Sequence, residues 1–193
     1  MEYKYFKTKY LTDVKNALEQ LYINDRTLLN KKRRTHEQTI TFRIAHYLSN
    51  KLEDREGYYI DCEYHGDINK DRGRKELPLD DNEKPRKIRP DIIYHNRYQE
   101  NIFAIEAKLQ GISDADCKKI RALINERDYN YTEGFCIYNI GFNYVTVNVF
   151  LSGFKNKGIK IRYKFNPDEK ELEKDYIKSN EGEDVDIDEV HGL

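Results

Sequence analysis

Two short runs place charged residues inside strand-like apolar sequence. The first, 89–94, reads Arg-Pro-Asp-Ile-Ile-Tyr and contains Asp91, and the second, 102–109, contains Glu106 and Lys108. A charge in an apolar strand costs free energy unless another group compensates it. Two carboxylates beside an ammonium could hold a hard divalent cation next to a phosphodiester. These residue types therefore predict phosphodiester hydrolysis as the chemistry.

The polar segment 96–101 between the two runs is turn-prone, which predicts a β-hairpin. If His95 pairs with Ile102, Asp91 lies opposite Glu106 and both side chains share one face of the sheet. Lys108, two residues after Glu106, falls on the same face. The alternative is an ordinary ion pair on an exposed strand face.

A helix predicted to start at Thr35 brings a third carboxylate. The sequence Thr35-His-Glu-Gln38 matches a capping box, and the apolar stripe that follows is Ile40, Ile44, Leu48 and Leu52. Glu37 extends this stripe backward by one turn, which aims its carboxylate at the interior edge. Alternatively, Glu37 only complements the helix dipole in the first turn.

The remaining elements alternate between helix and strand periodicity. Residues 10–29 read as an amphipathic helix interrupted near Asn24-Asp25, 58–64 as a strand, and 66–87 as a long loop. Ser113-Asp-Ala-Asp116 is a second capping box and opens a helix. Strands are predicted at 135–140, 145–151 and 159–165. We expect an α/β (α+β) fold with a mixed sheet flanked by helices.

Length and charge indicate one domain with a tail. The chain has 193 residues, of which 36% are charged, and a net charge of -1. Residues 168–193 contain eleven acids and three lysines, a charge of -8, so residues 1–167 carry +7. We expect one domain over 1–167, with its core at about 35–141, and an acidic, flexible tail over 168–193. The tail is either a solubilising terminus or a nucleic-acid mimic that occupies a basic groove.

The sequence argues against a membrane protein and against a zinc site. No apolar run approaches the roughly 20 residues of a membrane span, and the segment after Met1 lacks the apolar stretch of a signal peptide, so we expect a cytosolic protein with no membrane partner. Cys62, Cys117 and Cys136 lack a CxxC spacing and are interpreted as small buried residues. Oxygen ligands favour Mg²⁺ or Mn²⁺ instead.

The chain resembles the PD-(D/E)XK nuclease superfamily, which has the restriction-endonuclease-like fold. The resemblance is carried by Pro90-Asp91, by Glu106-Ala107-Lys108 and by the helix that contains Glu37. It covers about 35–141 and implies a core of α-β-β-β-α-β order, with an extra N-terminal helix and extra C-terminal strands.

The resemblance implies roles for the clustered residues. Asp91 and Glu106 would be Mg²⁺ (or Mn²⁺) ligands, with the Ala107 carbonyl as a further ligand, and Glu37 would complete the metal shell. Lys108 would orient the attacking water and offset charge on the phosphorus.

Nucleic-acid contacts are predicted around this cluster. Gln110 continues the strand face of Glu106 and would touch the substrate backbone. A phosphate-binding rim would combine helix cations with loop cations, namely Lys118, Lys119 and Arg121 with Lys70, Arg72, Arg74, Lys75, Arg86, Lys87 and Arg89. For each of these cations taken singly, a solvated surface residue is the favoured interpretation, and only together do they predict a rim.

The function predicted from these observations is a metal-dependent endodeoxyribonuclease in restriction, phage defence or repair, with DNA favoured over RNA as substrate. One alternative is a catalytically silent module of the same fold that binds nucleic acid or protein. Another is a subunit that needs a partner for activity. Assembly as a homodimer or with a partner subunit stays open.

Overall fold

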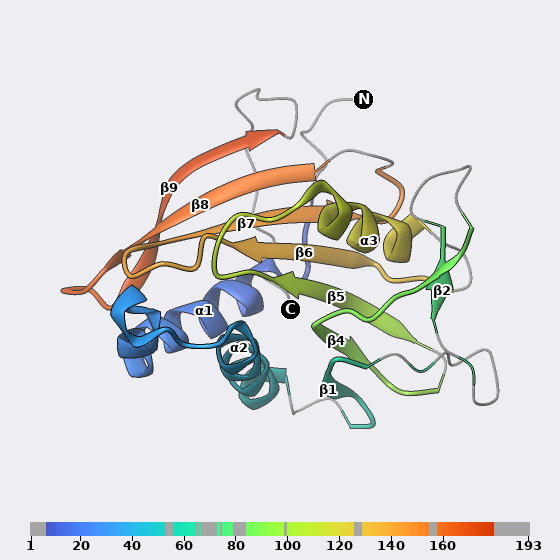
Figure 1. The fold of residues 1–193 in the computed structure, drawn as a ribbon, viewed down its shortest axis with the longest axis horizontal. Coiled ribbons are helices and arrows are strands. Elements are labelled where there is room, and N and C mark those ends of the chain that lie inside the picture. Colours follow the sequence, from blue (N-terminus) through green and yellow to red (C-terminus); the bar gives the residue numbers. More distant parts are fainter. Residues whose placement is uncertain are drawn as a thin grey trace.

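A seven-stranded mixed sheet with helices on both faces forms the protein (Figure 1). The computed structural model describes residues 7–52, 56–64, 66, 73, 75–78, 84–98, 100–125, 129–154 and 158–179. The strand order in the main sheet is β1-β4-β5-β6-β7-β8-β9, and β2 and β3 form a separate pair. The predicted mixed sheet flanked by helices is therefore confirmed.

The bounds of the elements follow the chain. The helices are α1 (Leu11–Asn24), α2 (Glu37–Leu52) and α3 (Asp114–Asn125), with short 3₁₀ turns at Arg26–Leu29 and Lys31–Arg33. The strands are β1 (Tyr59–Cys62), β2 (Glu76–Leu77), β3 (Arg86–Lys87), β4 (Ile92–His95), β5 (Asn101–Ala107), β6 (Glu133–Tyr138), β7 (Tyr144–Leu151), β8 (Gly158–Asn166) and β9 (Glu171–Ser179).

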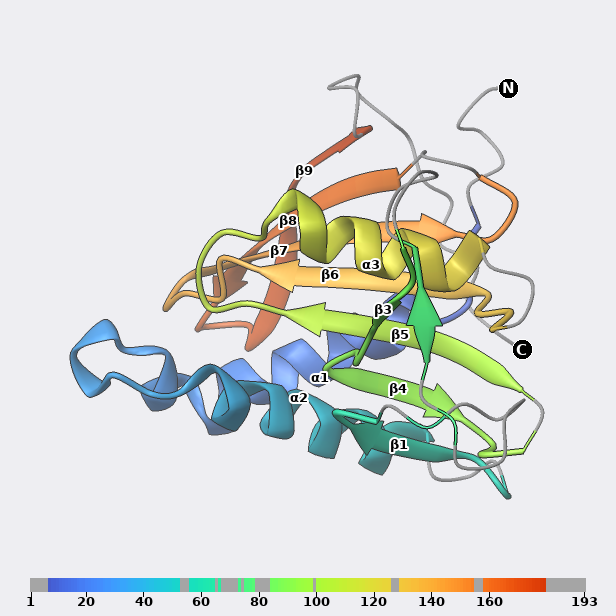
Figure 2. The ribbon, with the colours of Figure 1, turned by 45° about the vertical axis from the view of Figure 1, so that its right-hand side comes forward.

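The two faces of the sheet carry two apolar clusters. On one face, buried residues of α1 and α2 pack against β4, β5, β6, β7 and β8. On the other, Ile120, Leu123 and Ile124 of α3 pack with Ala104 of β5 and Cys136 of β6. Figure 2 shows α3 on one side of the sheet and α1 and α2 on the other. Strands β5 and β6 are parallel because α3 supplies the crossover between them.

The β4-β5 hairpin forms largely in the predicted register. Ile92 pairs with Ile105 and Tyr94 with Phe103, but the register shifts after Tyr94. His95 therefore pairs with Asn101 and not with the predicted Ile102. Because this irregularity lies at the turn, the opposite end of the hairpin keeps the predicted alignment.

Two of the three helix boundaries that the sequence marks agree with the structure. The interruption near Asn24-Asp25 is confirmed, because α1 ends there and a 3₁₀ turn follows. The Ser113 capping box is confirmed by the Ser113 hydroxyl and the Asp116 carboxylate, which exchange hydrogen bonds with each other's backbone N–H groups. The capping box with Thr35 as N-cap predicts His36 as the first helical residue, whereas α2 begins at Glu37, and the Gln38 amide donates to Glu63 across the site.

The predicted tail boundary is wrong. Glu171–Ser179 form β9, which pairs antiparallel with β8 as the last strand of the sheet. Buried Leu172 ties this strand to α1, because its backbone N–H donates to the Glu19 carboxylate. The domain thus extends beyond residue 167, and the rest of the predicted tail, 180–193, lies outside the described residues.

The expectations for cysteines and for the membrane are only partly met. Cys136 is buried and Cys117 half-buried, but Cys62 is exposed, contrary to the prediction. All three are free thiols. In the described ranges, the helices are too short or too polar to span a bilayer.

Close contact between α3 and β6 depends on Gly134. A methyl group at Gly134 would lie 2.4 Å from Ile120 Cγ2 and 2.6 Å from Ile124 Cδ1. We expect Gly134→Ala to lower the free energy of unfolding by about 1–3 kcal/mol, since overpacking forces the helix away from the sheet. Urea unfolding measures this. Gly111→Ala is the control, because nothing lies within 4 Å of the added methyl, and a change as large in this control would contradict the packing argument.

Candidate functional site

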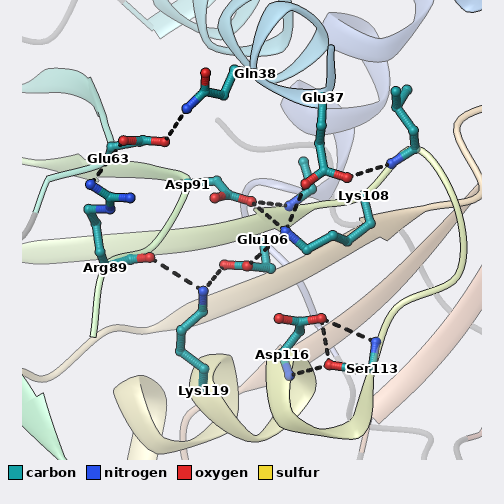
Figure 3. Close-up of polar contacts among 12 residues, drawn as sticks. Glu37, Gln38, Glu63, Arg89, Asp91, Glu106, Lys108, Ser113, Asp116 and Lys119 are labelled. Atoms are coloured by element: carbon teal, nitrogen blue, oxygen red, sulfur yellow. Dashed lines mark hydrogen bonds and ion pairs between the residues drawn. The ribbon is translucent and has the colours of Figure 1, made fainter. Parts of the chain in front are cut away.

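Five charged side chains meet at the end of β5, between α2 and α3 (Figure 3). Glu37 is the first residue of α2, and Asp91 immediately precedes β4. Glu106 lies in β5, Lys108 follows its last residue, and Lys119 comes from α3. The predicted Glu37, Asp91, Glu106 and Lys108 are thus brought together, and α3 adds Lys119, which the sequence had placed in the phosphate-binding rim.

The Lys108 ammonium is the centre of this cluster. Its Nζ lies 3.0 Å from Glu37 Oε1, 3.2 Å from Glu106 Oε1 and 3.7 Å from Asp91 Oδ2. Lys119 Nζ contacts the other oxygen of Glu106. Three carboxylates thus surround the Lys108 ammonium, and a second ammonium, that of Lys119, contacts Glu106.

The backbone after β5 holds two of the carboxylates in place. Asp91 Oδ2 accepts a hydrogen bond of 2.8 Å from the Ala107 N–H, and Glu37 Oε2 accepts one of 3.1 Å from the Leu109 N–H. The Lys108 N–H donates to the Ile137 carbonyl of β6, which fixes the segment itself. The sheet and α2 therefore act jointly to position the Asp91 and Glu37 carboxylates.

The centre of the cluster is largely removed from water, whereas Glu37 at its edge is 41% exposed. The Glu106 side chain is 3% exposed, and those of Asp91 and Lys108 are 20% and 24% exposed. The alternative of an ordinary ion pair on an exposed strand face does not describe this arrangement. Charges at this depth are costly even when paired, which is typical of functional sites.

Burial dominates the electrostatics of the two central acids. Desolvation raises the pKa of Asp91, more than the Ala107 N–H and Lys108 lower it. Desolvation, reinforced by the Asp91 charge, likewise raises the pKa of Glu106 despite Lys119 and Lys108. Burial opposes the charge on Lys108, but the Glu37 hydrogen bond and the carboxylates around it raise its pKa overall. For both acids, burial thus outweighs the stabilisation that the neighbouring lysines give to the charged form.

The donor chemistry of the cluster suits a hard divalent cation. Asp91, Glu106 and Glu37 offer only oxygen ligands, as Mg²⁺ and Mn²⁺ prefer. Their oxygens meet around the Lys108 ammonium, so an ion would displace this ammonium from the centre. In the described part of the chain, no three His, Cys, Asp or Glu side chains are already spaced to hold a metal. The residues fit a cation in chemistry, with Lys108 as its competitor.

The predicted rim cations divide into separate groups. Lys119 belongs to the cluster, where it also donates to the Arg89 carbonyl at 3.3 Å. Lys118 and Arg121 pair instead with Asp114, each at 3.3 Å. These two residues lie beside the cluster without joining it.

The described loop cations and Arg89 also do not form one continuous rim. The Arg89 guanidinium pairs with Glu63 at 3.1 Å. Lys75 is fully buried, donates to the Gly66 carbonyl and lies over the Tyr64 ring, so its prediction as a rim cation is wrong. Arg86 and Lys87 are exposed in β3, whereas Lys70, Arg72 and Arg74 lie outside the described residues.

Two features of the site were missed by sequence reasoning. Glu63 links α2 to the β4 approach, because it accepts from Gln38 and pairs with Arg89. Its left-handed backbone, with φ of 49°, ends the strand that alternation extended to residue 64. Gln110 lies in the loop after β5 and not on the strand face, since β5 ends at Ala107. Hydrophobic periodicity could reveal neither the contacts of Glu63 nor the end of β5 before Gln110.

Comparisons of the sequence with known proteins do not assign this site to a family. No protein-family model matches the chain, and a search of curated proteins finds no match.

The raised pKa values predict an unusual response to neutralisation. A carboxyl whose pKa is raised on folding binds its proton more tightly in the folded state, so stability falls as pH rises through the raised pKa. In EDTA at pH 8, we expect Glu106→Gln to leave the free energy of unfolding unchanged or raise it by about 1 kcal/mol. The variant should also lose part of the pH dependence, as measured by urea unfolding from pH 5 to pH 8.

Glu63→Gln is the matched control, since it removes a more exposed ion pair with Arg89 and should change stability by less than about 1 kcal/mol. A loss of about 3 kcal/mol or more in Glu106→Gln would show that the cluster is a structural ion-pair network instead.

Proposed function

We propose that the protein is a metal-dependent nuclease that hydrolyses phosphodiester bonds of DNA, with Mg²⁺ or Mn²⁺ as cofactor. The observation that carries this proposal is the convergence of Glu37, Asp91 and Glu106 on Lys108 at the end of a buried strand. A cytosolic role in restriction, phage defence or repair fits this chemistry.

The order of the elements supports the proposed relationship to PD-(D/E)XK nucleases. Helix α2, strands β1, β4 and β5, helix α3 and strand β6 follow one another as in the α-β-β-β-α-β core. Strands β1, β4, β5 and β6 are also neighbours in the sheet. The short β2-β3 pair is inserted between β1 and β4, and α1 and β7 to β9 surround the core.

The side chains can be assigned separate tasks. Asp91, Glu106 and Glu37 would hold the cation, which would polarise the scissile phosphate and lower the pKa of bound water. Lys108, released from the carboxylates, would orient the attacking water and face the charge that develops on the phosphate. Lys119 would keep Glu106 ionised and in position.

The charge balance favours a cation with the substrate. The three acids and two lysines sum to -1 when all are ionised, which repels a phosphodiester. One divalent cation changes this sum to +1, which complements the anionic substrate. The insufficient compensation of the buried acids is then an electrostatic preference for metal.

A second candidate is a nucleic-acid-binding module without catalysis. The observation in its favour is that Lys108 already forms ion pairs with all three carboxylates, as in a structural network. The third arrangement, a subunit activated by a partner or by dimerisation, uses the same cluster.

The test is cleavage of supercoiled plasmid and labelled DNA and RNA oligonucleotides in Mg²⁺ or Mn²⁺. We expect cutting that EDTA abolishes and that Asp91→Asn and Lys108→Met lower by about 10³-fold or more, because each removes stabilisation made in the transition state. Lys119→Met should cost about tenfold or more by leaving Glu106 less compensated.

Lys118→Met is the matched control, since Lys118 is the helix neighbour of Lys119 but pairs with Asp114. It should retain activity within about threefold. A folded wild-type protein that binds DNA without cutting it, and that Mn²⁺ does not stabilise against heat, would contradict the nuclease and favour the binding module.

A further inference from the structure

A pocket of about 650 Å³ opens directly beside the charged cluster. Its walls come from the segment before α2, the loop after β5 and the turn after β6. Figures 1 and 2 show these segments together at the ends of β5 and β6. Leu109 lines the pocket and donates its N–H to Glu37, so pocket and cluster share a wall. A strand with a phosphate at the cluster would have its next nucleotide at this pocket.

The lining of the pocket has three chemical components. Apolar side chains form the walls, namely Leu28, Leu29, Leu109 and Ile140. Three amides, those of Asn30, Gln110 and Asn139, lie among them, and the exposed cations Lys31 and Arg34 come from the segment before α2. Apolar walls with a few polar groups are typical of small-molecule sites, and the volume is within their usual range of about 300–1,000 Å³. This combination matches the base and the phosphate of one nucleotide.

A second recess of about 410 Å³ continues the pocket. The two share Lys31, Asn139 and Gly141, so their linings are continuous. The second recess adds the aromatic rings of Phe142 and Tyr144 and the cations Lys160 and Arg162.

The aromatic rings of this recess are held in place by cations. The Arg26 guanidinium lies 4.0 Å from the Phe142 ring centroid and donates to the Phe142 carbonyl, while Phe142 remains 45% exposed. Arg162 lies 4.2 Å from the Tyr144 ring centroid. Positive charge interleaved with ordered aromatic rings is typical of surfaces that bind single-stranded nucleic acid.

We propose that the two joined recesses bind an unpaired segment of the substrate strand, with the base next to the scissile phosphate inside the larger pocket. This inference rests on the proposed nuclease function and specifies its substrate as DNA with a single-stranded segment. Lys31 and Arg34 contact the phosphates next to the buried base, and Lys160 and Arg162 contact those further along.

An unpaired base is required for two reasons. The Gln110 and Asn139 amides can hydrogen-bond a base edge only where no complementary strand occupies it. A stacked and paired base also cannot enter a pocket of this kind without leaving the duplex, which costs a few kcal/mol. A single strand, a flap or an unpaired end avoids this cost.

The first arm of the test measures binding without cleavage, by fluorescence anisotropy in EDTA. The probes are a labelled single strand of about 12 nucleotides and the corresponding blunt duplex. We expect the single strand to bind about tenfold or more tightly at matched salt. The double variant Lys31→Glu, Arg34→Glu should lower this affinity by about tenfold or more.

The control is Lys32→Glu, Arg33→Glu, which makes the same charge change in the same loop. These two exposed residues do not line either recess, so we expect a loss of no more than about threefold. Equal losses in the two double variants, or equal affinity for single strand and duplex, would overturn the proposal.

A second arm tests whether a base enters the pocket. Abasic positions are introduced one at a time along the single strand, and one position should cost the wild type about tenfold in affinity, as expected for a lost stacked base. No position-dependent loss would overturn the base pocket. Because both arms omit metal, strand binding without any later cleavage would refute only the nuclease, whereas metal-dependent cutting of duplex without single-strand preference would refute only this inference.

Discussion

The burial of Glu106 is the constraint on which the functional end of the molecule depends. Its side chain points from β5 toward α3, where a carboxylate 3% exposed to solvent requires positive charge nearby. Lys119 supplies part of that charge because the crossover helix between β5 and β6 must cover this face. Lys108 supplies the rest, and its position at the strand end also brings it within reach of Glu37 from α2. The cluster therefore exists only when both helix layers are packed on the sheet.

The hairpin that carries Asp91, Glu106 and Lys108 could be predicted from the sequence because strand alternation is a local property. The Ser113 cap is local for the same reason, since donor and acceptor lie three residues apart. Lys119 was assigned to a surface rim instead of the cluster, because its role depends on how α3 crosses the sheet. Lys75 is the extreme case, since its burial depends on tertiary contacts, among them those with the Tyr64 and Tyr129 rings and the Gly66 carbonyl.

Strand β9 shows why composition alone misplaced the end of the domain. Its sequence is rich in acids and lysines, which resembles a solvated tail. Charged residues on the last strand of a sheet, however, discourage pairing with another chain, so edge strands often have this composition. Leu172 packs into the core, and it connects the strand to α1 through Glu19. A few inward side chains were sufficient to order a segment whose average composition is that of a tail.

The carboxylates of the cluster repel a polyanion, whereas the cations of the recesses attract it. This opposition links the cluster and the recesses. In the proposed function, Lys31 and Arg34 attract the backbone of a nucleic acid, whereas the cluster beside them, with its charge of -1, repels the phosphate that must approach most closely. Arg34 and Asn139, at the pocket wall, have left-handed backbones with φ of 48° and 51°, a conformation uncommon for a residue such as arginine. In the proposed function, the recess cations hold the strand before the cluster accepts its phosphate. A divalent cation would reverse the sign of the cluster, so the proposed function separates binding of the strand from chemistry at the phosphate, each under its own electrostatic control.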